Sequence, residues 1–143
     1  MELYDLLREG WIIGPVESML LRGLYSSGWR SDWKVNSVSG YEFEVNDVGI
    51  TDVGLPSDRD RFLEALVARA RSFACHAIKD AQNLNYGNLL TAVISIGIDD
   101  DYLTHGATVK FFTRTAGCPQ FFDDIERFQL EAMAIIEVFD CSD

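Results

Sequence analysis

Apolar residues recur at helical spacing over one long stretch of the chain, and this pattern predicts a helix from about Ser57 to Lys79. Ser57 is a good N-cap residue. Asp58 and Asp60 place carboxylates in the first turn, where the helix dipole favours negative charge. The apolar stripe of the predicted helix comprises Phe62, Leu66, Ala70, Phe73 and Ala77. The turn-forming sequence "NLNYGN" over 83–88 ends the helix.

Shorter segments have the pattern of β-strands. The run "LLTAVISIGI" over 89–98 is rich in β-branched residues and bounded by turn residues, which predicts a buried strand, and "ATVKFFTR" over 107–114 is its predicted partner. The sequence "YEFEV" over 41–45 alternates apolar and acidic residues. Together with "WKVNSV" over 33–38, it predicts two antiparallel strands joined by a tight turn.

The two ends of the chain are less regular. The sequence "ELYDLLRE" over 2–9 predicts a short helix that stops near Gly10, whereas 11–25 is compatible with strand or helix. The segment 119–139 has apolar residues at helical spacing, and its second half also alternates like a strand. Its Glu, Ala and Met content and its acidic start favour a helix.

Together these elements predict an α+β fold, in which an antiparallel sheet of about four to five strands carries two long helices. The chain has 143 residues, of which 48% are hydrophobic, so it can bury one sizeable core. It contains no internal repeat, low-complexity tract or Pro/Ser-rich linker. We therefore expect a single globular domain over 1–143.

Net charge changes this picture most, because 12 Lys and Arg residues against 23 Asp and Glu residues give −11. Phosphate backbones and anionic membrane surfaces repel such a protein, so we expect neither nucleic acid nor a membrane as its partner. A basic protein partner is favoured. The charge is uneven: 81–143 carries ten acidic and three basic residues, whereas 57–80 carries four acidic and five basic residues.

The cysteines Cys75, Cys118 and Cys141 are odd in number, widely spaced and without a CxxC motif. This pattern is not typical of a disulfide framework or a zinc module, so we expect reduced thiols. The N-terminus lacks the basic start and apolar core of a signal peptide, and no apolar run approaches the ~20 residues that span a bilayer. These features predict a cytoplasmic protein.

No motif indicates catalysis, and we expect no catalytic, cofactor-binding or metal-binding residues. Three consecutive aspartates at 99–101 point in alternate directions on an extended chain, whereas a calcium loop alternates its ligands. His76 lies at the edge of the apolar stripe and His105 in a predicted loop, and no nucleophile motif accompanies either. Cys75 projects away from the stripe, but its neighbours match no cysteine-hydrolase signature. Neither GxGxxG nor GxxxxGK(S/T) occurs, so no nucleotide cofactor is indicated.

Two acidic clusters remain as candidate functional residues. One lies in "DDDYLTH" over 99–105, the predicted loop between two strands, and the other in "FFDDIER" over 121–127. Carboxylates concentrated at the edges of elements steer a basic partner towards the surface that carries them. The predicted partner-binding residues are Asp99, Asp100, Asp101, Tyr102, His105, Phe122, Asp123, Asp124 and Glu126. The same clusters also fit solvated turns that serve solubility alone.

Small size, a net charge of −11, acidic edges such as "IDDDYLTH" and "FFDDIER", and the lack of a catalytic motif give the chain a general character. In this character it resembles the small acidic immunity proteins of bacterial toxin–immunity systems, such as those of contact-dependent growth inhibition. The resemblance implies a protein that binds a cognate toxin, a basic nuclease-type domain, and covers its active site or substrate groove. Two alternatives stay open: an acidic DNA mimic that inhibits a DNA-binding protein, and a small ligand-binding module or enzyme.

Overall fold

The computed structural model describes residues 2–14, 17–28, 38–84, 87–98, 104–114 and 131–141. Their helices and strands follow in the order α1 (Leu3–Glu9), β1 (Trp11–Ile13), β2 (Met19–Leu21), α2 (Arg22–Gly28), α3 (Val38–Val45), β3 (Asp47–Ile50), α4 (Arg59–Asp80), β4 (Leu90–Ile98), β5 (Thr104–Thr113) and β6 (Glu131–Ile136). Short 3-10 helices are η2 (Ala81–Asn83), η3 (Gly87–Leu89) and η5 (Val138–Cys141). Helices and antiparallel sheets in one chain agree with the predicted α+β class.

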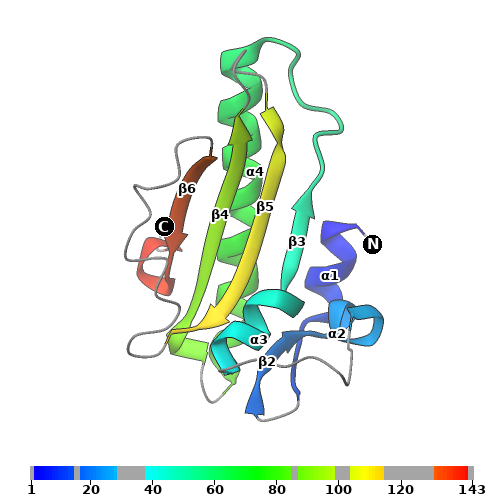
Figure 1. Ribbon diagram of the computed structural model, residues 1–143, viewed down its shortest axis with the longest axis vertical. Helices are drawn as coiled ribbons and strands as arrows, with labels where there is room; N and C mark the ends of the chain where they lie inside the picture. Colours follow the sequence, from blue (N-terminus) through cyan, green and yellow to red (C-terminus); the bar gives the residue numbers. More distant parts are fainter. Residues whose placement is uncertain are drawn as a thin grey trace.

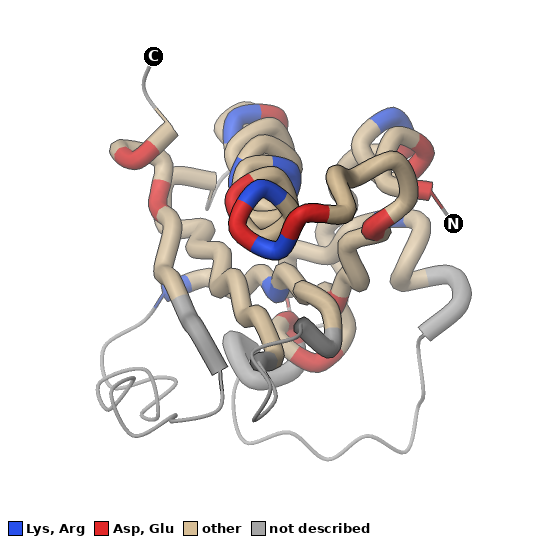
Figure 2. Tube along the Cα trace, turned by 90° about the horizontal axis from the view of Figure 1, so that it is seen from above, with Lys and Arg blue, Asp and Glu red and all other residues tan. Residues whose placement is uncertain are grey.

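Four strands form an antiparallel sheet in the order β3-β5-β4-β6, and β1 and β2 form a separate hairpin. The predicted strand over 89–98 and its predicted partner are confirmed as β4 and β5, which pair from Leu90 with Thr113 to Ile98 with Thr104. The long helix α4 covers one face of the sheet, and α3 lies at the lower end of β5 (Figure 1). The view from above shows α4 and α1 on the same side of the sheet (Figure 2).

The predicted apolar stripe fixes how α4 packs on the sheet. Leu66, Ala70, Phe73 and Ala77 are all buried, and they face inward residues of the strands. Asp58 caps the helix, with a side-chain oxygen that accepts a hydrogen bond from the Arg61 amide at 3.3 Å. The cap therefore lies one residue after the predicted Ser57.

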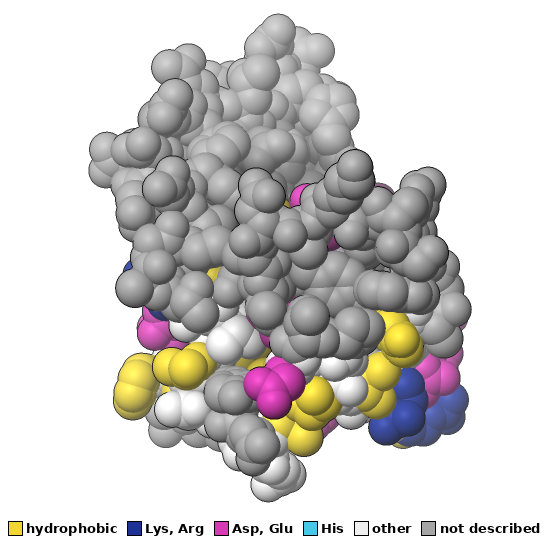
Figure 3. All heavy atoms as spheres, turned by 60° about the horizontal axis from the view of Figure 1, so that its bottom comes forward, with side chains coloured by type: hydrophobic (Ala, Val, Ile, Leu, Met, Phe, Trp, Pro, Cys, Tyr) yellow, Lys and Arg dark blue, Asp and Glu magenta, His cyan; other side chains and the backbone are white. Residues whose placement is uncertain are grey.

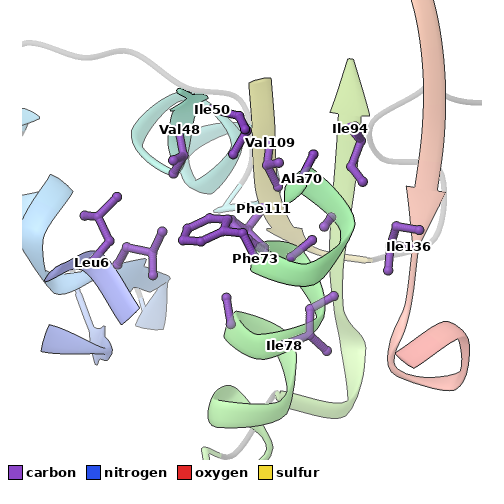
Figure 4. Close-up of a cluster of buried hydrophobic side chains, with 14 of the residues drawn as sticks. Leu6, Val48, Ile50, Ala70, Phe73, Ile78, Ile94, Val109, Phe111 and Ile136 are labelled. Atoms are coloured by element: carbon purple, nitrogen blue, oxygen red, sulfur yellow. The ribbon is translucent and has the colours of Figure 1, made fainter. Parts of the chain in front are cut away.

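Phe111 of β5 lies at the centre of this core (Figure 4). Its ring makes edge contacts with the rings of Trp11 and Phe73, at centroid separations of 5.3 and 6.0 Å. The indole nitrogen of Trp11 donates a hydrogen bond to the carbonyl oxygen of Ala77 at 2.9 Å. These contacts join the N-terminal hairpin, α4 and the sheet, and a buried aromatic side chain of this kind contributes about 2–3 kcal/mol.

The predicted strand over 41–45 is wrong, because this segment forms the second half of α3. Glu42, Val45 and Asn46 are all buried, and their spacing of three and four residues brings them onto one side of a helix. The alternation of apolar and acidic residues in "YEFEV" instead grouped Glu42 with Glu44, which is exposed. The helix is favoured here because it buries Glu42 where its carboxylate can accept hydrogen bonds.

The predicted second long helix over 119–139 is wrong in its described part, because Glu131–Ile136 form β6; 119–130 lie outside the described residues. β6 pairs with β4, which is buried on both faces, as Val93 and Ile94 show. A central strand of this kind needs a neighbour along each edge, and that pairing overrides the helix propensity of Glu, Ala and Met. The described part of the chain therefore has one long helix, not two.

Candidate functional site

Most of the predicted partner-binding residues lie outside the described part of the chain. These residues are Asp99, Asp100, Asp101, Tyr102, Phe122, Asp123, Asp124 and Glu126. His105 lies in β5 and not in a loop as predicted, and its side chain is outside the described part. The two strand ends that flank the first cluster, Ile98 and Thr104, are described and pair with each other.

The start of α4 lies at the same end of the molecule as these strand ends, and the connection from β3 leads up to it (Figure 1). Asp52 in the connection from β3 to α4, the cap residue Asp58 and Asp60 in the first turn are all exposed. In the view from above, acidic positions follow this connection into the start of α4 (Figure 2). We use the term acidic end for Asp52, Asp58 and Asp60 together with the strand ends Ile98 and Thr104.

The carboxylates of Asp52, Asp58 and Asp60 form no ion pair with another described residue, and that of Asp58 accepts the hydrogen bond of the Arg61 amide. Within the described part of the chain, the ion pairs involve other acids, such as Asp5 with Arg8 at 2.8 Å and Asp47 with Lys110 at 3.7 Å. Arg59 and Arg61 lie next to the acidic end in sequence and offset part of its charge. At the opposite end, apolar side chains alternate with a few acidic ones, and basic and acidic side chains share one edge (Figure 3).

Arg69 of α4 fixes the connection that carries Asp52. Its Nη1 atom donates hydrogen bonds to the carbonyl oxygens of Thr51 at 2.7 Å and Val53 at 2.9 Å. The amide of Val53 also donates to the Thr51 hydroxyl at 3.2 Å, and the Val53 side chain is 77% exposed. A surface loop held in this way loses less conformational freedom when a partner binds.

A second feature is a cleft of ≈ 570 Å³ beside α4. Its described lining comprises Ala68, Arg71, Ser72, Cys75, His76, Lys79 and Asp80 of α4 and Cys141 of η5. Cys75 and Cys141 form a disulfide, with Cα atoms 5.3 Å apart. The prediction of reduced thiols is therefore wrong for these two residues, and Cys118 lies outside the described part. The cytoplasmic location, which rested partly on reduced thiols, stays a prediction.

Two basic side chains, Arg71 and Lys79, and one acidic side chain, Asp80, line the cleft beside this disulfide. Arg71 and Lys79 lie one helical turn before and after Cys75, and both line the cleft. The Arg71 guanidinium also donates a hydrogen bond to the carbonyl oxygen of Asp140 in η5. Sequence reasoning missed this site because it treated Cys75 as inert. The signal for it is a cysteine with a basic residue four positions away on each side.

Glu42 and Asn46 form a buried polar pair that sequence reasoning also missed. Glu42 Oε2 accepts hydrogen bonds from the Met19 amide at 2.7 Å and the Thr113 hydroxyl at 2.8 Å, and Oε1 accepts one from the Thr113 amide at 2.7 Å. Asn46 accepts from the Leu21 amide and donates to the Met19 carbonyl, both at 2.9 Å. Burial raises the pKa of Glu42, and its hydrogen bonds offset part of the rise. The pair joins β2 to the end of β5, so its role is structural.

The described residues do not meet the requirements of a three-ligand metal site or of a membrane-spanning helix. Among them, no three His, Cys, Asp or Glu side chains lie close enough together to hold a metal ion. None of the described helices combines the length and the apolar composition needed to cross a membrane. Comparisons with family models, curated proteins and solved structures find no match for this chain. The functional argument therefore rests on the acidic end and on the cleft.

Proposed function

We propose that this protein is an immunity protein, which binds a basic toxin domain and neutralises it by covering its active site or substrate groove. The acidic end is the binding surface in this proposal. The observation that supports it most is the set of exposed carboxylates along the β3–α4 connection and the first turn of α4, namely Asp52, Asp58 and Asp60. The chain between Ile98 and Thr104 adds Asp99, Asp100 and Asp101 in sequence.

The proposed mechanism is electrostatic and steric. Carboxylates of the acidic end occupy the positions that substrate phosphates take in a nuclease-type groove, and the bulk of the sheet end blocks access. A net charge of −11 adds a long-range attraction to a basic partner, and such steering raises association rates by ~10–10³-fold at low salt. The Arg69 hydrogen bonds keep the β3–α4 connection ordered before the partner arrives.

The proposal predicts that the neighbouring gene encodes a large secreted protein, and the test uses the C-terminal region of that protein. We expect this region to be toxic when expressed alone and harmless when co-expressed with the present chain. We also expect the purified pair to associate more slowly as salt rises from 50 to 300 mM. Lack of protection, or of binding, would rule out the neighbouring product as the target and contradict the proposal.

Charge-removing variants locate the surface. The triple variant Asp52→Asn, Asp58→Asn, Asp60→Asn should slow association about tenfold at low salt and flatten its salt dependence. Asn is as good an N-cap residue as Asp, so the fold of α4 is retained. The matched control is Glu2→Gln, Glu9→Gln, Glu17→Gln, which removes the same charge from exposed residues elsewhere in the chain. Equal slowing in both triples would mean that net charge alone acts, and that the acidic end is not the contact surface.

The aspartates 99–101 are tested separately by Asp99→Asn, Asp100→Asn and Asp101→Asn in one chain. We expect slower association here as well, with the same thermal stability as the wild type. The DNA-mimic alternative shares the acidic logic but has a different target. Binding to a DNA-binding protein of the host, in competition with DNA and without protection from the neighbouring toxin, would favour that alternative.

A further inference from the structure

The disulfide in the cleft is accessible from one side. Cys75 is half-buried and lines the cleft, whereas Cys141 is only 4% exposed. A volume of ≈ 570 Å³ lies within the ~300–1,000 Å³ range of sites that hold small molecules. Both cysteines line the cleft, and Cys75 is the more exposed residue of the two, so we expect a small thiol in the cleft to attack Cys75.

The charges around the cleft select the kind of thiol. Arg71 and Lys79 flank Cys75 on α4, and the described lining contains one acidic residue, Asp80, so two basic residues stand against one acidic residue there. Positive charge attracts an anionic thiol and its attacking thiolate, and it stabilises the thiolate that Cys75 becomes. The rest of a protein with net charge −11 has the opposite preference. The charge of the described lining is thus opposite in sign to that of the whole chain.

We propose that this cleft is a thiol–disulfide exchange site for small anionic thiols, with the sulfur of Cys75 as the atom attacked. A thiolate RS⁻ bonds to Cys75 Sγ, the Cys75–Cys141 bond breaks, and Cys141 leaves as a thiolate that takes a proton from water. A second RS⁻ attacks the RS sulfur of the mixed disulfide, which yields RSSR and the Cys75 thiolate. Two small thiols are oxidised as one protein disulfide is reduced. Cys141 Sγ lies 3.6 Å from the carbonyl oxygen of Glu137, which can accept the hydrogen bond of the new thiol.

The experiment treats the folded, oxidised full chain with glutathione, neutral 2-mercaptoethanol and cationic cysteamine, and follows free thiols by alkylation and mass spectrometry. Rates are expressed per thiolate, so that differences in thiol pKa cancel. We expect the rate to rise in proportion to glutathione concentration, to exceed that of cysteamine, and to give a mixed disulfide on Cys75. A rate that levels off at the unfolding rate, a faster reaction with cysteamine, or a mixed disulfide on Cys141 would overturn the proposal.

Variants separate the charges of the cleft from general effects. Lys79→Gln and Arg71→Gln should each slow the glutathione reaction about 3–10-fold and leave the 2-mercaptoethanol reaction within about twofold of the wild type. Arg61→Gln is the matched control, because Arg61 is on the same helix and is not among the lining residues. Arg71 also holds η5 through Asp140, so faster reduction of Arg71→Gln by all thiols would report a loosened turn. In that case the charge effect is judged from Lys79→Gln alone, and an unchanged glutathione rate in this variant contradicts the proposal.

Discussion

Replacing Cys75 and Cys141 together by serine will lower the free energy of unfolding by about 2–4 kcal/mol. The disulfide joins α4 to η5 across a sequence separation of 66 residues, so it removes many conformations from the unfolded chain. The folded state changes less than the unfolded state, because β6 still pairs with β4 and Arg71 still binds the Asp140 carbonyl when the disulfide is absent. Urea unfolding of the oxidised wild type and of the double variant, followed by circular dichroism, measures the difference.

Dithiothreitol provides the control for this prediction. It should destabilise the wild type by as much as the double serine variant is destabilised, and it should leave the variant itself unchanged. Equal urea midpoints for the oxidised wild type and the variant would contradict the prediction, since they would mean that the bridge does not constrain the unfolded chain.

Glu42→Ala will be at least as destabilising, by about 3–5 kcal/mol. The substitution leaves the buried amides of Met19 and Thr113 without acceptors, and each unsatisfied buried donor costs about 1–3 kcal/mol. Glu42→Gln should lose about 1–3 kcal/mol, because in either orientation its amide nitrogen faces one of these two N–H groups. Glu44→Ala is the matched control, since Glu44 is exposed on the same helix and should change stability by less than about 0.5 kcal/mol. Equal losses at Glu42 and Glu44 would contradict the role of the buried pair.

The pH dependence of the Glu42 contribution follows from the direction of its pKa shift. Burial raises the pKa of Glu42 above its ordinary value of 4.5, so folding favours the protonated form. Its stabilising contribution is therefore complete below the ordinary pKa and is lost as pH rises through the raised pKa. The difference in unfolding free energy between wild type and Glu42→Gln should accordingly shrink from pH 4 towards pH 8. A difference that stays constant or grows over this range would show that burial does not favour the protonated form.

The sequence correctly predicts those elements in which the spacing of apolar residues fits one type of secondary structure and also matches the tertiary contacts. In α4, the buried residues Leu66, Ala70 and Phe73 have the 3.6-residue spacing and no competing pattern. In β4, a short β-branched run lies between two turn-rich segments. Such signals depend only on neighbours in the chain, so they can be recognised without knowledge of the fold.

Three features could not be predicted, because their causes lie far away in the sequence. Glu42 is helical and buried because the amides of Met19 and Thr113, 23 and 71 residues away, need acceptors. The segment that forms β6 is a strand because it pairs with the edge of β4 that β5 does not occupy. The pairing of Cys75 with Cys141 follows from η5 packing beside α4, which spacing alone does not reveal.

The candidate sites show the same division. The sequence places Asp58 and Asp60 at the start of α4, where it predicts only a favourable interaction of their carboxylates with the helix dipole. Their relation to the β4–β5 strand ends depends on the direction in which α4 runs along the sheet, with its start at the end where β4 finishes and β5 begins (Figure 1). Likewise, the sequence shows Arg71 and Lys79 only as polar residues of a helix. The structure shows that they line a cleft together with Cys141.

The disulfide also divides the chain into two mechanical parts. If the protein is pulled from its two ends, force follows the shortest covalent path, which reaches Cys75 and crosses directly to Cys141. The strands β4, β5 and β6 lie within the bypassed segment and bear no tension through the backbone. Reduction would place this 66-residue separation under load and lengthen the extended chain by about 230 Å. Oxidised, the protein shields three of the four strands of its main sheet from stretching.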